Sequence, residues 1–387
     1  LVFLAGCATA PKRNPLPPEK LHQAELVGMP GVRIPMNPFS IDEAEIDASL
    51  ESTRLDVGSN GQPMTLLALS GGGAHGAWGA GVLCGWSASE NRPDFDIVTG
   101  ISTGALTATY AFLGSDFDDE LKTAYTEITD DDVYRTRNIF GILKHNDAIA
   151  DSSPLLEQLR ERFGPEVLAR VAEEHRKGRR LYVGSTNLDS QTMMTWDMGA
   201  IAASGHPQTA DTFCRVLLAS ASVPVAFPPV TFEVKADGVV YDEIHADGGV
   251  IAQVYGFALL YRLMELADRS EGAMYVLRNT YMAPEWVAID PSMVSLAGRS
   301  IGTLTKTQGL GDVFRAWVVA EQTGIEFNLC DIPASVHPPT SDAQFDPAYM
   351  TQLFDAGFEA GMTDQVWQKA PPGVQILDDE STPRQQP

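Results

Sequence analysis

Short apolar runs alternate with longer helical patterns along most of this chain. Residues 64–69, Met-Thr-Leu-Leu-Ala-Leu, form a continuous apolar run typical of a strand buried on both faces. The same reading predicts further strands at 95–99, 180–184, 273–279 and 325–330, and helices from residue 105 and at 212–220, 256–269, 292–323 and 349–360. Strands that alternate with helices predict a layered α/β fold.

The two ends of the chain lack this alternation. Residues 8–62 are polar and rich in proline, with one helix predicted at about 40–54, where Ser40 and Glu43 match a capping box. From residue 370 the chain is again acidic and rich in proline, which predicts a loose tail. We therefore divide the chain into an N-terminal tether and extension at 1–61, one domain at 62–369, and a tail at 370–387.

The charge balance limits the partners of this 387-residue chain. Its 27 basic and 51 acidic residues give a formal net charge of −24 at pH 7. So acidic a surface repels phosphate backbones, which argues against nucleic-acid binding, and favours neutral or zwitterionic ligands over anionic ones. Four cysteines show no metal-binding spacing. The cysteines therefore indicate no metal or redox chemistry.

The first seven residues resemble a targeting signal. Residues 1–6 are apolar or small, and Leu4-Ala5-Gly6-Cys7 is similar to the lipobox of bacterial lipoproteins, whose cysteine becomes lipid-modified. A lipid anchor on Cys7 would attach the chain to the bacterial cell envelope, either to the outer membrane or to a membrane surface that faces the periplasm. This hypothesis requires a basic stretch and an apolar stretch encoded upstream of Leu1.

A glycine-rich turn follows the first predicted strand. Residues 71–76 read Gly-Gly-Gly-Ala-His-Gly and open a predicted helix, so their backbone N–H groups could bind an anion at the helix N-terminus. Because Gly71, Gly73 and Gly76 also match GxGxxG, the anion could be a dinucleotide pyrophosphate. The turn alone does not distinguish these uses.

A second motif lies between a predicted strand and a predicted helix. Residues 100–104, Gly-Ile-Ser-Thr-Gly, match the GxSxG nucleophile elbow, in which Gly100 and Gly104 allow a sharp bend that exposes the hydroxyl of Ser102. The position between strand and helix favours a nucleophile over an ordinary turn.

A third motif could supply the base that such a serine needs. Asp247-Gly248-Gly249 would usually be only a turn, but a carboxylate in a closed pocket has a raised pKa and can accept a proton near neutral pH. Most histidines lie in polar or loop-like segments, and His75 lies in the glycine turn. His245 is close enough in sequence to Asp247 to be a rival base.

Together the motifs resemble the patatin-like phospholipase family. Its members have a glycine-rich oxyanion loop, then GxSxG, then Asp-Gly-Gly or Asp-Gly-Ala. Residues 69–81 and the Ser/Ala- and Pro-rich stretch 219–229 are also similar to the family, so the resemblance covers about 64–250. One departure is His75, where many members carry Arg or Lys.

The resemblance implies a three-layer α/β/α sandwich with a central, mostly parallel sheet, and a serine hydrolase that cleaves carboxylic esters of lipids. It implies Ser102 as nucleophile and Asp247 as proton acceptor, without a catalytic histidine and without a metal or organic cofactor. The implied oxyanion hole comprises Gly71, Gly72 and Gly73, and the motif glycines are Gly76, Gly100, Gly104, Gly248 and Gly249. Two alternatives remain, a nucleotide-binding α/β protein and a non-catalytic lipid-binding lipoprotein of the same fold.

Overall fold

The computed structural model describes residues 13–37, 63–138, 141, 147–266, 271–336 and 343–374. Cys7, the helix predicted at 40–54 and most of the tail from 370 lie outside these residues. Within them, no helix is both long and apolar enough to cross a membrane.

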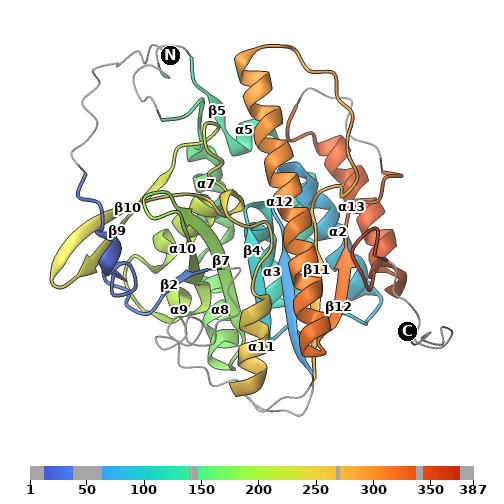
Figure 1. The fold of residues 1–387 in the computed structure, drawn as a ribbon, viewed down its shortest axis with the longest axis horizontal. Helices are drawn as coiled ribbons and strands as arrows, with labels where there is room; N and C mark the ends of the chain where they lie inside the picture. Colours follow the sequence, from blue (N-terminus) through green and yellow to red (C-terminus); the bar gives the residue numbers. More distant parts are fainter. Residues whose placement is uncertain are drawn as a thin grey trace, which may run out of the picture.

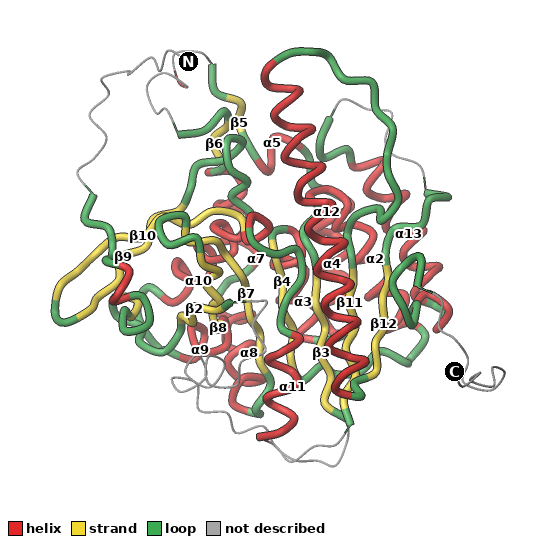
Figure 2. The backbone as a smooth tube through the Cα atoms, viewed as in Figure 1, coloured by secondary structure: helices red, strands yellow, loops and turns green. Residues whose placement is uncertain are grey.

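A ten-stranded mixed sheet runs through the middle of the molecule (Figures 1 and 2). Its five central strands are parallel and lie in the order β7 (Arg180–Asn187), β4 (Ile97–Ile101), β3 (Met64–Leu69), β11 (Gly272–Leu277) and β12 (Glu326–Cys330). Five further strands extend the sheet by antiparallel pairing, namely β10 (Val239–Asp247), β9 (Val230–Ala236), β1 (Glu25–Leu26), β8 (Thr192–Asp197) and β2 (Arg33–Met36).

Helices cover both faces of the sheet, because successive side chains of each central strand point to opposite sides. Leu67 and Leu69 of β3 join one core, while Leu66 and Ala68 join the other. The first core packs against α2 (Gly76–Ala88), α3 (Thr103–Leu113), α4 (Asp118–Thr126), α5 (Asp130–Val133), α7 (Ser153–Arg162), α8 (Pro165–Arg176), α9 (Met198–Ala203), α10 (Thr209–Ser220) and α13 (Pro347–Gly361). The second packs against α11 (Phe257–Leu266) and α12 (Met293–Thr323). The predicted three-layer α/β/α arrangement is confirmed.

The antiparallel strands were not apparent from the sequence pattern. The described part of the N-terminal extension contributes two of them, since β1 pairs with β9 and β2 pairs with β8. Arg13 also binds the carboxylates of Asp189 and Asp242. Residues 13–36 therefore pack along the sheet, and they include part of the segment that the sequence presents as a tether. A two-stranded sheet of β5 (Arg135–Thr136) and β6 (Ala150–Asp151) lies apart from the main sheet.

The register on β7 brings two distant chain segments together. β4 runs parallel to β7 and ends with Ile101 opposite Gly184, whereas β10 runs antiparallel and ends with Asp247 opposite Ser185. β8 occupies the other edge of β7 along this stretch, so β4 and β10 share one edge and approach each other from opposite directions. The residues that follow Ile101 therefore meet Asp247.

Candidate active site

Ser102 occupies a strained turn between β4 and α3. Its backbone angles are φ 55° and ψ −126°, a conformation that non-glycine residues rarely adopt. Gly100 and Gly104 permit the bend, because a Cβ on Gly100 would lie 2.5 Å from Gly104 O and one on Gly104 would lie 2.4 Å from Leu69 O. The structure thus has the strand, sharp turn and helix that the GxSxG pattern predicts.

Two serines of the Ser/Ala-rich stretch hold this turn and the end of β10 in place. The Ser102 N–H donates to Ser220 Oγ at 2.9 Å, and Ser220 Oγ donates in turn to Gly184 O at 2.7 Å. The Asp247 N–H donates to Ser222 O at 2.9 Å. Sequence reasoning noted this stretch but did not assign Ser220 a positioning role, which depends on contacts between distant segments.

Asp247 is buried at the C-terminal end of β10. Its Oδ1 accepts a hydrogen bond of 2.7 Å from the Gly249 N–H, while Oδ2 is buried and has no hydrogen-bond partner. Burial raises the pKa of the Asp247 carboxyl to about 6, and hydrogen bonding from the Ser102 side chain and the Gly249 N–H opposes that rise. The carboxyl can therefore be an unprotonated proton acceptor near neutral pH.

The Ser102 hydroxyl lies close enough to Asp247 to lower that pKa, but it is not aligned for a full hydrogen bond to Oδ2. Catalytic hydrogen bonds without substrate are often long or poorly aligned and tighten when substrate binds. The free Oδ2 is the atom available to receive the Ser102 proton.

The glycine turn lies against Ser102. A Cβ on Gly71 would be 3.1 Å from Ser102 Cβ, and Gly72 and Gly73 have φ of 159° and 58°. Among the described residues, the backbone N–H groups of Gly71, Gly72 and Gly73 donate to no protein acceptor. Free N–H groups beside a nucleophile can stabilise an oxyanion.

Asn279, which follows β11, holds this turn and was not identified from the sequence. Its N–H donates to Ser70 Oγ at 2.9 Å, its Nδ2 donates to Ser70 O at 2.9 Å, and its Oδ1 accepts from the Gly79 N–H at 3.1 Å. A Cβ on Gly72 would lie 2.1 Å from Asn279 O, so only glycine fits there. A single buried asparagine has no sequence pattern that would reveal this role.

The segment that holds the candidate site is similar to a known protein family. Residues 67–254 match the family model of patatin-like phospholipases. This chain carries a patatin-like phospholipase domain. The crystal structure of VipD from Legionella pneumophila is similar with 15% sequence identity and a TM-score of 0.35, over 79% of this chain and 67% of that one. A search of curated proteins finds no match.

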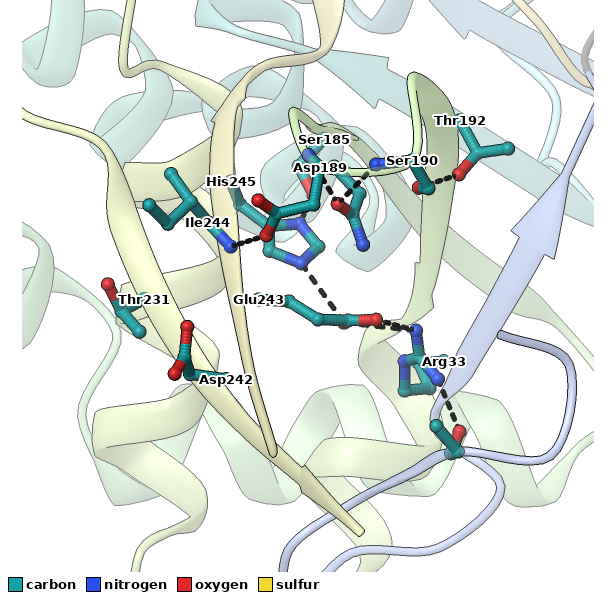
Figure 3. A network of polar contacts seen from close by, with 12 residues as sticks. Arg33, Ser185, Asp189, Ser190, Thr192, Thr231, Asp242, Glu243, Ile244 and His245 are labelled. Atoms are coloured by element: carbon teal, nitrogen blue, oxygen red, sulfur yellow. Dashed lines mark hydrogen bonds and ion pairs between the residues drawn. The ribbon is translucent and has the colours of Figure 1, made fainter. Parts of the chain in front are cut away.

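The rival base His245 belongs to a different cluster of the patatin-like domain (Figure 3). Its Nδ1 lies 2.9 Å from Ser185 Oγ, and its Nε2 lies 3.3 Å from Glu243 Oε2. Trp196 Nε1–H donates to the same Ser185 oxygen, which leaves the Ser185 hydroxyl hydrogen for His245 Nδ1. Both ring nitrogens are thus engaged away from Ser102.

His75 also lacks the contacts of a catalytic base. Its ring packs edge-on against Tyr281 and Tyr349, with ring centroids 5.5 and 6.0 Å away. Burial lowers the pKa of His75, so the ring is neutral at neutral pH. It therefore supplies no positive charge to the oxyanion turn, where many family members carry Arg or Lys.

Other features of the described residues offer no competing site. A hollow of about 590 Å³ lies at the N-terminal ends of the central strands, around Asp94, Asp96 and Glu271, and does not include Ser102. No three His, Cys, Asp or Glu side chains within the described part of the chain gather in a way that could hold a metal ion. The candidate site is identified by the positions of Ser102 and Asp247 at the C-terminal ends of β4 and β10, and not by the volume of a hollow.

Proposed function

We propose that this chain hydrolyses carboxylic esters of lipids through a Ser102–Asp247 dyad. The observation that carries the proposal is the convergence of β4 and β10 on β7, which places a strained serine beside a buried carboxyl with a free Oδ2. The patatin-like domain supports a lipid ester as the substrate.

The first step forms an acyl-enzyme. Asp247 Oδ2 accepts the proton of Ser102 as Oγ attacks the ester carbonyl carbon. The N–H groups of the glycine turn, above all those of Gly72 and Gly73, donate to the oxyanion of the tetrahedral intermediate. When the C–O bond breaks, the protonated Asp247 returns the proton to the leaving alcohol.

The second step frees the enzyme by the same chemistry in reverse. Water attacks the acyl carbonyl while Asp247 accepts one of its protons, and the glycine turn again binds the oxyanion. The proton then passes to Ser102 Oγ as the fatty acid leaves. Asp247 serves as base and acid in turn, which a carboxyl with a pKa of about 6 can do near neutral pH.

A soluble ester tests the chemistry without requiring a lipid surface. The purified chain should release p-nitrophenol from p-nitrophenyl esters, and Ser102→Ala should lower kcat by about 10⁴-fold or more. Equal release by both proteins would contradict the assignment of Ser102. No release by either, with short and long acyl chains, would favour the non-catalytic lipid-binding alternative.

A further inference from the structure

The N-terminal half of α12 extends past the end of the central strands (Figure 1). All residues from 296 to 304 are exposed. Two side chains of this part of α12 contact the preceding loop. Arg299 donates a hydrogen bond to Glu285 O, and Lys306 forms a 2.8 Å ion pair with Glu285. A helical segment this short is marginally stable in water without a packing partner, and Gly298 and Gly302 weaken it further.

The projecting segment carries large apolar side chains. Trp286 is 89% exposed, Met293 84% and Leu304 70%. On a helix of 3.6 residues per turn, Met293, Leu296 and Leu304 point within about 80° of one another, so they form one apolar face. We define the α12 patch as Trp286, Val287, Met293, Leu296, Ile301 and Leu304, all of them exposed. An exposed apolar helix face of this kind is typical of an interaction site.

The α12 patch is attached to the candidate active site. Gln308 Nε2 donates to Ile251 O and, at 3.4 Å, to Val250 O, in the turn that follows Asp247. Asp312 Oδ2 accepts a 2.7 Å hydrogen bond from the Gln253 N–H in the same loop. Val250 is itself an exposed apolar residue, with 44% exposure. These hydrogen bonds tie the helix that carries the patch to the loop that follows Asp247.

The charge of this region differs from that of the whole chain. Between residues 281 and 308 two acidic residues, Glu285 and Asp290, balance two basic ones, Arg299 and Lys306, so the segment is neutral within a chain of net charge −24. Two copies of so acidic a chain repel each other, which disfavours a second copy as the partner. A neutral surface with an exposed tryptophan suits the head-group region of an uncharged lipid layer.

We propose that the α12 patch docks the protein on a zwitterionic or neutral lipid surface. Docking buries the apolar face of α12 and presents lipid esters to Ser102. The inference rests on the proposed ester hydrolysis for its purpose, but lipid binding itself needs no turnover and is measured separately.

Tryptophan fluorescence tests the docking directly. Of the six tryptophans, four are at most 8% exposed and Trp317 is half-buried, so Trp286 alone is exposed. With phosphatidylcholine vesicles, the full chain carrying Cys7→Ser, to prevent acylation, should show a blue shift in emission and quenching by brominated acyl chains. Trp286→Phe should abolish both signals.

A matched pair of triple variants separates the patch from general surface apolarity. Met293→Ser/Leu296→Ser/Leu304→Ser should lower vesicle affinity at least about tenfold in flotation assays, and lower the ratio of vesicle to soluble-ester hydrolysis similarly. The control, Leu188→Ser/Val239→Ser/Val240→Ser, changes residues that are 41–45% exposed in the β7–β8 turn and at the start of β10, and should bind vesicles like the parent. Thermal melting checks that both variants fold.

Three results would overturn the docking proposal. They are failure of the parent to bind vesicles, equal loss in the control variant, and a parent dimer in analytical ultracentrifugation that the α12 variant dissociates. Vesicle binding without hydrolysis of any ester would instead contradict the proposed function and leave the docking surface intact. Hydrolysis of soluble esters without vesicle binding would contradict the docking proposal and leave the proposed ester hydrolysis intact.

Discussion

Two buried carboxylates lie four residues apart on β10 and have opposite surroundings. Glu243 forms a fully buried pair with Arg33 of β2, with Nη2 2.8 and 3.0 Å from its two oxygens, and it also contacts His245. No cation among the described residues perturbs Asp247, and one of its oxygens has no hydrogen-bond partner there. The charge pair of Glu243 contributes to the stability of the fold. Asp247, which has no paired cation, has a raised pKa and can therefore accept a proton during catalysis.

The difference between Asp247 and Glu243 predicts that Asp247→Asn has the largest effect on catalysis. An amide cannot accept the Ser102 proton, so kcat should fall by about 10³–10⁴-fold, while folding survives because Asn is neutral in the same buried volume. Steady-state hydrolysis of a soluble ester measures the first expectation, and urea unfolding measures the second.

The matched control for this variant is Asp237→Asn, an exposed change in the β9–β10 turn that should leave kcat unaltered. Turnover by Asp247→Asn within tenfold of the parent would show that another group accepts the proton.

Glu243→Gln should affect stability rather than chemistry. Removing this carboxylate leaves the buried Arg33 guanidinium unpaired, which typically costs about 3–5 kcal/mol in the free energy of unfolding. Urea denaturation measures the loss, and kcat per folded molecule should stay near the parent value.

Two further variants sharpen that result. Arg33→Met/Glu243→Met should recover most of the stability, because it removes both charges together. Glu233→Gln, an exposed change on β9, should shift stability by no more than about 0.5 kcal/mol. If Glu243→Gln were as mild as Glu233→Gln, the buried pair would not stabilise the fold.

The raised pKa of Asp247 predicts a smaller, pH-dependent effect. Because the base must be unprotonated, kcat/KM should be level above about pH 6 and fall about tenfold per pH unit below it. A pH–rate profile with a soluble ester measures this. A profile centred near pH 4 would mean that burial does not perturb the carboxyl.

The same shift gives stability the opposite dependence on pH. The folded state binds this proton more tightly than the unfolded state, whose carboxyl has a pKa near 3.8. The resulting stabilisation is fully present below pH 3.8 and is lost as the pH rises through about 6. A shift of about two units corresponds to about 3 kcal/mol. Urea unfolding of the parent and Asp247→Asn at several pH values isolates this component, since the variant lacks it.

The sequence by itself located the local elements on which the site depends. The run at 64–69 is β3, and the strand expected near 95–99 is β4 at Ile97–Ile101, with Ser102 directly after it. Such features follow from neighbouring residues, because a buried strand needs a continuous apolar run and a sharp elbow needs flanking glycines. The family motifs placed Ser102, Asp247 and the glycine turn in the same way.

Only the tertiary structure decided how these pieces meet. The antiparallel approach of β10 along the edge that β4 leaves free brings Asp247 to Ser102, while the contacts of Ser185 and Glu243 remove His245 from consideration. The supporting role of Asn279 and the exposure of α12 also depend on segments distant in the chain. Local propensity acts over a few residues, whereas strand register, burial and charge pairing arise from long-range packing that no single segment encodes.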